Sequence, residues 1–299
     1  MISIIITSFK EPLTIGKAID SFLNQDIKEK YEIIVSSPDE ETADIVNNYS
    51  KRYKQVKLFK DPGKGKMRAL NLLFKEIKSD ILILTDGDVF VSDNSVNEIL
   101  SAFSDKKIGC VTGRPVPVND KKTMFGYWAH LLLYGAHKAR EKRNSLNKYF
   151  TCSGYLFAFR NGIVNEFQTD IPEDAIIPHM FIVEGYGLKY IPKAEVFVKY
   201  PDNFNDWIAQ KKRVSKAYIN LEKVDYKGKK VPKMKSFLNE ILEGTFIAVS
   251  YPRTLREIYY TLLLFPARLY MWFYTYYESK IKKQAHKDAW KQIKSTKNL

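Results

Sequence analysis

The sequence predicts an α/β protein whose mostly parallel central sheet is flanked by helices. Apolar runs of four to six residues recur along the first 112 residues, amphipathic stretches separate them, and 45% of the 299 residues are hydrophobic. Short continuous apolar runs are typical of strands buried on both faces, and the helices between them are the crossovers that parallel strands need. A chain of this length can bury a sizeable core.

Five strands are expected in this first part, over residues 2–7, 31–36, 56–59, 81–85 and 108–112. The helices expected between them carry apolar residues three and four positions apart. They cover residues 13–24, 40–53, 65–78 and 95–103. Ligands of such open sheets bind beyond the carboxyl ends of the strands. The candidate site is therefore set by the loops after the first, second and fourth strands.

The same domain is expected to continue to residue 222, because no repeat and no Ser- or Pro-rich linker interrupts it. We expect a helix over 123–146, a strand within FTCSGYLFAFRNG, a helix from near Glu173, short strands up to Val198 and a helix over 204–221. A second segment, residues 223–299, opens with DYKGKKVPKMK, which predicts a basic and weakly structured connector.

The second segment is expected to contact a membrane surface. Residues 258–277 are long enough to cross a bilayer, but Pro266 and Arg268 near their middle disfavour a transmembrane span. An amphipathic helix in the interface fits better, with Trp272 at headgroup level and KIKK facing anionic lipid. A core helix or an oligomer interface is the alternative.

Charge and cysteine content favour an anion-binding protein of a reducing compartment. The chain has 48 Lys and Arg against 34 Asp and Glu, a net charge of +14, which suits nucleic acid, acidic lipid or sugar nucleotides. Its two cysteines lack metal-type spacing, and the first apolar run is too short for a secretory leader. We therefore expect a cytoplasmic protein, peripheral on the cytosolic membrane face.

Two short stretches carry candidate chemistry. In TDGD, Asp86 and Asp88 leave the end of an apolar strand one residue apart, and together they can hold Mg²⁺ or Mn²⁺. An ordinary turn before a helix is the alternative. PGKGKMRALN places Lys66 at an expected helix N-terminus, which suits phosphate, although it has neither Walker nor GxGxxG spacing.

Seven motifs, taken in order, resemble glycosyltransferase family 2, whose members are inverting enzymes with the GT-A fold. They are IIITSFKE, SSPDEET, GKGKMRALN, TDGD, TCSG, PEDA and QKKRV. The later motifs are similar to those of the cellulose synthase and hyaluronan synthase branch. The resemblance implies transfer of a sugar from a nucleoside diphosphate sugar, with a UDP-sugar favoured, to a hydroxyl of a lipid-linked or membrane-associated glycan.

The resemblance also implies the roles of individual residues. TDGD stands at the position of the family's DxD motif. The resemblance therefore implies that Asp88 coordinates the metal, and that Asp86 orients the donor and assists in metal binding. PEDA is similar to the TED element, which makes Asp174 the general base. The acceptor side is then formed by Glu173, Ser153 and Gly154. The donor is bound by Thr7, Glu11, Asp39 and Lys66, together with Gln210 and Arg213 of the QxxRW-like element.

Two departures from the family pattern narrow the prediction. Ser36 and Ser37 stand where the family usually has two acids, and Asp39 is offered instead. Val214 replaces the Trp of QxxRW, a residue associated with a growing polymer, so transfer of a single sugar is expected. A polyprenyl-phosphate sugar synthase, whose acceptor needs no strong base, is the alternative enzyme. A basic nucleic-acid-binding protein is a distant alternative, because no recognised binding module is present.

Overall fold

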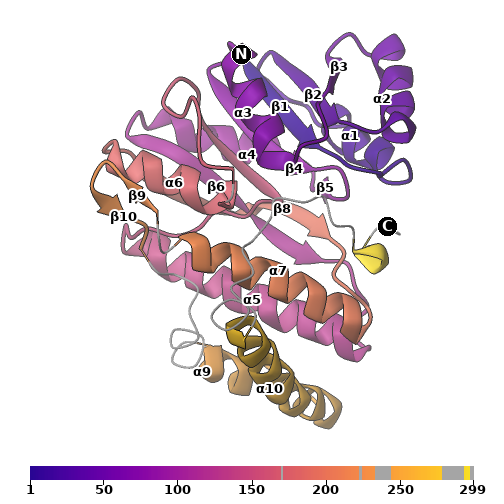
Figure 1. Cartoon of the computed structure of the whole chain (residues 1–299), viewed down its shortest axis with the longest axis vertical. Helices are drawn as coiled ribbons and strands as arrows, with labels where there is room; N and C mark the ends of the chain where they lie inside the picture. The colour runs from indigo at the N-terminus through magenta and orange to yellow at the C-terminus, as the bar shows by residue number, and fades with distance from the viewer. Residues whose placement is uncertain (170, 222–223, 233–243, 278–292, 297–299) are drawn as a thin grey trace.

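An eight-stranded sheet, in the order β3-β2-β1-β4-β7-β6-β8-β5, forms the centre of the protein (Figure 1). The computed structural model describes residues 1–169, 171–221, 224–232, 244–277 and 293–296. The strands are β1 (Ile2–Thr7), β2 (Tyr31–Ser37), β3 (Val56–Lys60), β4 (Ile81–Asp86), β5 (Phe90–Val91), β6 (Ile108–Pro117), β7 (Leu156–Arg160) and β8 (Gly187–Val198). Strands β3, β2, β1 and β4 pair in parallel, as do β6 and β8, which confirms the mostly parallel prediction.

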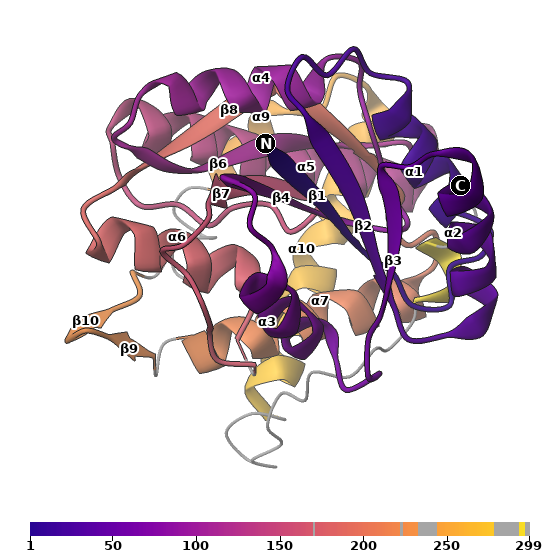
Figure 2. The same ribbon diagram turned by 90° about the horizontal axis from the view of Figure 1, so that it is seen from above.

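Helices cover both faces of this sheet (Figure 2). Because strand residues alternate between faces, Ile4 and Ile6 enter one core cluster and Ile5 enters the other. The first cluster is covered by α1 (Ile15–Leu23), α2 (Glu40–Arg52) and α4 (Ser95–Ser101), followed by η1 (Ala102–Ser104). The second is covered by α3 (Lys66–Glu76) and α6 (Glu173–Val183).

A third apolar cluster joins the C-terminal helices to the rest of the chain. It lies between α5 (Met124–Ser145), α7 (Phe204–Leu221) and α10 (Leu255–Tyr276). Two further helices of this part of the chain are α9 (Thr245–Ser250) and η4 (Lys294–Thr296). Trp128 Nε1 donates to the carbonyl of Tyr260 at 2.7 Å, and the hydroxyls of Tyr127 and Thr261 lie 2.6 Å apart. Figure 1 shows α10 outside α5 and α7, at the end of the molecule opposite β1 to β3.

Several elements differ from the expectation. The connector is more ordered than its basic composition indicated, because β9 (Asp225–Tyr226) and β10 (Lys229–Lys230) pair as a hairpin. Lys227 and Gly228 both have positive φ, at 49° and 77°, as a tight two-residue hairpin turn requires. Strand β8 is one continuous strand instead of several short ones, and irregularities in its register with β6 accommodate the bends.

The strands that complete the sheet run against their neighbours. Strand β7 lies antiparallel between β4 and β6, and the short, unexpected β5 pairs antiparallel with β8. Strand β6 runs on to Pro117, beyond the expected end at Thr112, because its last residues pair with the second half of β8.

Among the described helices, none has the length and apolar character that a membrane span requires.

Two glycines of α5 provide a matched test of its packing. A Cβ on Gly126 would lie 2.0 Å from the Asp120 carbonyl oxygen, whereas one on Gly135 would meet no atom within 4 Å. We expect Gly126→Ala to lower the free energy of unfolding by about 1–3 kcal/mol, because backbone must move. Gly135→Ala should raise it by about 0.5–1 kcal/mol through helix propensity. Chemical denaturation measures both, and equal effects would contradict the described start of α5.

Candidate functional site

The carboxyl ends of three parallel strands bring the expected donor-binding loops together. Thr7 of β1 lies in register with Ser36 of β2 on one side and with Asp86 of β4 on the other. Its hydroxyl donates to Asp86 Oδ1 at 3.1 Å. Asp88 follows in the next turn and is half-buried. The first, second and fourth strand ends therefore form one edge, as the sequence predicts.

Lys66 connects this edge to the PEDA motif. As the first residue of α3, it is presented by Gly65, whose φ of 108° suits a residue without a side chain. Its Nζ lies 2.6 Å from Asp86 Oδ1 and 2.6 Å from Glu173 Oε1. One ammonium group thus neutralises two carboxylates that come from distant parts of the sequence.

Burial and charge act in opposite directions on this ion-paired group. Burial alone lowers the pKa of Lys66, but the attraction of Asp86 and Glu173 outweighs it and raises that pKa above its ordinary value. Burial raises the pKa of Glu173, and the nearby charge of Asp174 adds to this, while Lys66 opposes both. Lys66 therefore stays charged and keeps a 4% exposed glutamate tolerable.

The TCSG and PEDA motifs lie against each other beside Lys66. The backbone N–H of Cys152 donates to the carbonyl of Asp174 at 2.8 Å. A Cβ placed on Gly154 would lie 3.6 Å from Glu173 Oε1 and 3.8 Å from Asp174 Oδ2. Ser153, next to Gly154, is buried, and its backbone N–H donates to Thr112 Oγ1 at 2.9 Å. The expected acceptor-side residues and the expected base are therefore neighbours.

Glu11 and Asp39, which were expected to bind the sugar nucleotide, hold the loops of the site in place. Glu11 is buried, accepts a hydrogen bond from Ser8 Oγ at 2.7 Å, and lies so close to Gly87 that a Cβ there would be 2.5 Å from Glu11 Oε2. Together with Ser8, Glu11 therefore leaves little room for a side chain at Gly87, between the two aspartates of TDGD. Asp39 caps α2 through the N–H of Thr42 and accepts the N–H of Lys10 at 2.7 Å. Their contact with a nucleoside stays a prediction.

Asp61, which the motifs did not single out, lies buried at the end of β3. Its carboxylate accepts Ser36 Oγ at 2.9 Å and the Gly63 N–H at 2.8 Å. Burial raises the pKa of Asp61, these two hydrogen bonds lower it, and the charge of Asp39 raises it again. The available signal was an acid directly after a strand at this edge, in KDPGKG. Asp61 therefore sets the shape of the loop that precedes Lys66.

Tyr155 is close to the TDGD loop, since its carbonyl accepts a hydrogen bond from Thr85 Oγ1 at 2.7 Å. Burial raises the pKa of Tyr155 far above its ordinary value, with Asp88 and Asp86 adding to the effect. The positive charge of Arg213 acts in the opposite direction on the same phenol. Arg213 is exposed, and Gln210 is buried with no hydrogen-bond partner for Oε1 among the described residues. Tyr155 was missed, although it directly follows the TCSG motif.

The donor set of this loop suits a divalent cation that also binds phosphate. Mg²⁺ and Mn²⁺ prefer oxygen ligands, and Mg²⁺ typically binds through one or two carboxylates, waters and substrate phosphates. Lys66 and Thr7 both contact Oδ1 of Asp86. The candidate metal ligands in this loop are the carboxylate of Asp88 and Oδ2 of Asp86. Within the described ranges, no three His, Cys, Asp or Glu side chains are arranged to hold a metal.

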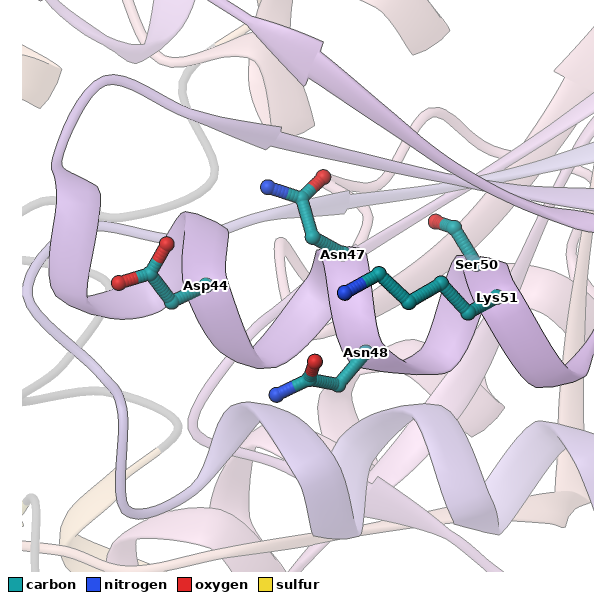
Figure 3. Close-up of a pocket in the computed structure, with 5 residues that line it drawn as sticks. All are labelled: Asp44, Asn47, Asn48, Ser50 and Lys51. Atoms are coloured by element: carbon teal, nitrogen blue, oxygen red, sulfur yellow. The ribbon is translucent and has the colours of Figure 1, made fainter.

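A surface pocket of about 640 Å³ lies elsewhere, on the outer side of α2 (Figure 3). It is lined by Asp44, Asn47, Asn48, Ser50 and Lys51. These residues lie along α2 beyond its N-terminal turn, and none belongs to the motifs described above. The pocket is therefore separate from the candidate site.

Replacing Lys66 tests the double ion pair. In Lys66→Met, Glu173 loses its cation, so its folded pKa rises further above the unfolded value near 4.5. A raised acid pKa favours folding at low pH, and this contribution is lost as pH rises through the folded pKa. We expect a loss of about 3 kcal/mol at about pH 8 and a smaller loss at about pH 5, measured by chemical denaturation.

Lys60→Met is the matched control, because it removes the exposed Lys60–Glu40 pair. It should change the free energy of unfolding by less than about 1 kcal/mol at either pH. An equal loss at both pH values in Lys66→Met would contradict the role given to Glu173.

Several curated proteins are similar to this chain in sequence. A probable glycosyltransferase, YdaM of Bacillus subtilis strain 168, is 27% identical over 225 residues, covering 71% of this chain and 54% of that protein. The O-antigen chain rhamnosyltransferase WbaN of Salmonella anatum is 25% identical over 181 residues, covering 58% and 56%. The poly-beta-1,6-N-acetyl-D-glucosamine synthase of Staphylococcus epidermidis is 23% identical over 219 residues, covering 71% and 53%. The chain thus spans about half the length of these curated relatives.

Solved structures share the fold. The mannosyltransferase PcManGT from Pyrobaculum calidifontis, in complex with GDP-Man and Mn²⁺, has a TM-score of 0.58 at 16% identity, covering 93% of this chain and 80% of that one. S. aureus TarS 1–349 in complex with UDP-GlcNAc has a TM-score of 0.50 at 14% identity, covering 76% and 68%. The GT-A fold is confirmed. Because the model of Glycosyl transferase family 2 matches residues 3–167, more than half of the sequence, the chain belongs to this family.

Proposed function

We propose that the chain is an inverting, metal-dependent transferase that moves one sugar from a nucleoside diphosphate sugar to an acceptor hydroxyl. The observation that carries the proposal is the double contact of Lys66, which joins Asp86 of the TDGD loop to Glu173 of PEDA. This contact brings Asp86, Lys66 and Glu173 together, and Asp174, the proposed base, directly follows Glu173 in the sequence. Such a grouping suits attack of a hydroxyl on a carbon that is losing a diphosphate.

The residues have separate tasks in this proposal. Asp88, with the second oxygen of Asp86, holds Mg²⁺ or Mn²⁺, and a metal there would offset the charge that develops on the leaving diphosphate. Lys66 and Arg213 add positive charge on the phosphate side. Asp174 accepts the proton of the acceptor hydroxyl, and Gly154 leaves space beside it. The unpaired Oε1 of Gln210 is a buried acceptor that a sugar hydroxyl can satisfy.

The choice of substrates rests on likeness and on the base. A UDP-sugar is favoured because TarS is solved with UDP-GlcNAc, and the GDP-Man bound by PcManGT is the alternative donor. We propose a lipid-linked or membrane-associated glycan as acceptor, at the cytosolic membrane face. A polyprenyl phosphate is the second candidate, but it would need no proton acceptor, so the position of Asp174 beside Gly154 favours a hydroxyl.

Removing the metal-binding carboxylate tests donor recognition. We expect the purified protein to bind one member of a panel of UDP- and GDP-sugars in the presence of Mn²⁺ and to lose it when EDTA is added. Asp88→Ala should weaken this binding about tenfold or more, because it removes a direct metal ligand. Asp93→Ala, an exposed acid in the same loop region, is the control and should bind normally. Calorimetry measures each affinity, and donor binding by Asp88→Ala at full strength would refute the assignment.

Removing the base tests the transfer step separately. Asp174→Asn should slow release of the nucleoside diphosphate in the presence of a membrane-lipid extract by about 10²–10⁴-fold. The reason is that an asparagine side chain cannot take the proton from the attacking hydroxyl of the acceptor. Donor affinity should stay within about twofold of the original, since Asp174 contacts the acceptor side. Asp105→Asn, on the surface after η1, is the control. A rate that is unchanged in Asp174→Asn would favour the polyprenyl-phosphate alternative.

A further inference from the structure

Helix α10 packs on the fold through one side only. Its buried side chains are Glu257, Thr261, Leu264, Ala267, Met271 and Thr275, spaced three or four residues apart. This spacing marks one side of a helix. Through Leu264 and Ala267 this side belongs to the cluster shared with α5 and α7. A helix that needed only to pack on the domain would carry polar residues on its other side.

The opposite side of α10 is apolar and exposed along its whole length. We call it the α10 stripe; it consists of Leu255, Ile258, Tyr259, Leu262, Phe265, Leu269, Tyr270, Phe273 and Tyr276. Leu262, Leu269 and Phe273 are 61%, 60% and 69% exposed. The helix has 22 residues and is therefore about 33 Å long. Single exposed apolar residues are ordinary, but a continuous stripe of this length marks an interaction surface.

Helix α9 also exposes apolar side chains. Phe246 and Val249 lie three residues apart and are 78% and 66% exposed. Tyr251, just after α9, lies against α5 with its ring 5.0 Å from that of Tyr134. The two C-terminal helices are thus held on α5 while their apolar side chains face away from it.

The charge of this part of the chain selects the partner. Residues 223–299 contain sixteen Lys and Arg against six Asp and Glu, a net charge of +10 out of +14 for the chain. Arg253 and Arg256 are exposed at the first end of the α10 stripe. Lys280, Lys282 and Lys283 follow its other end in the sequence, outside the described residues. Two copies of so basic a segment repel each other, whereas anionic lipid headgroups attract it.

The buried side of α10 contacts α7 beside the QKKRV segment. Lys212 Nζ is 3.5 Å from the centroid of the Tyr274 ring, and Ser215 Oγ contacts Met271 Sδ at 3.3 Å. These residues flank Arg213 and Val214 of α7, and Val214 is 37% exposed. A surface in contact with the α10 stripe would therefore lie close to the QKKRV segment.

We propose that the α10 stripe, together with Phe246 and Val249, lies flat in the headgroup region of an anionic lipid bilayer. Aromatic residues suit this depth, and the flanking arginines meet the lipid phosphates. The helix lies in the membrane plane and does not cross it. Its closeness to α7 then lets an acceptor reach Arg213 from the bilayer, a consequence that rests on the proposed function.

Flotation with lipid vesicles tests the surface without any donor or acceptor. The full chain should float with vesicles of phosphatidylcholine and phosphatidylglycerol, and much less with phosphatidylcholine alone or at high salt. The variant Leu262→Ser/Leu269→Ser/Phe273→Ser should partition about a hundredfold more weakly, because three membrane-facing side chains are lost. Val118→Ser/Leu146→Ser, at positions 41% and 53% exposed elsewhere, should float like the original chain.

A fluorescent label distinguishes immersion of the stripe from attraction by charge alone. Both native cysteines are fully buried, so Leu269→Cys can be labelled selectively with an environment-sensitive dye. Its emission should shift to the blue on adding anionic vesicles, while Asn48→Cys on α2 should show no shift. Unchanged emission at Leu269→Cys would overturn the proposal.

Two further outcomes would assign the surface to another partner or to none. If the serine variant floats normally, the stripe does not bind lipid. If sedimentation without vesicles shows a dimer that this variant dissociates, a second copy of the chain occupies the stripe. Because neither measurement involves sugar transfer, failure here leaves the proposed catalytic assignment intact, and loss of donor binding would leave this proposal intact.

Discussion

The ammonium group of Lys66 holds the site together because it is shared by carboxylates from the two halves of the domain. Asp86 and Glu173 are separated by most of a hundred residues, and each would be costly to bury alone. The shared cation fixes the start of α3, the end of β4 and the start of α6 relative to one another. A donor diphosphate entering the same space must compete with these carboxylates for the lysine, so donor binding and the position of Glu173 are expected to be linked.

Several carboxylates around this contact fix the conformations of the loops at the edge of the sheet. Glu11 lies so close to Gly87 that little room is left for a side chain there. Asp39 connects the loop after β1 to the start of α2, and Asp61 shapes the turn before α3. Each of these carboxylates is held by backbone or hydroxyl donors, which makes the edge of the sheet rigid. Preorganised loops of this kind spend little free energy on ordering when a ligand arrives.

Local patterns predicted the local features of this protein well. The first strand, the helix over residues 204–221 and the place of TDGD at a strand end all followed from periodicity and from motif order. Contacts between distant residues could not be predicted in this way, since no residue near Lys66 in the sequence indicates Glu173. The hairpin at Lys227 and Gly228 was missed because its basic composition concealed a turn signal, and the direction of β7 depends on long-range pairing.

The position of β7 also affects the order in which the central sheet can form during folding. This strand fills the space between β4 and β6, yet it is synthesised after both and after the whole of α5. Until it arrives, the strand that carries Asp86 has an open edge, and such edges favour pairing with other chains. The edge of β4 that carries Asp86 is therefore completed only by a strand from later in the chain. Long-range pairing of this kind slows folding, and the catalytic edge matures only when the second half of the chain is in place.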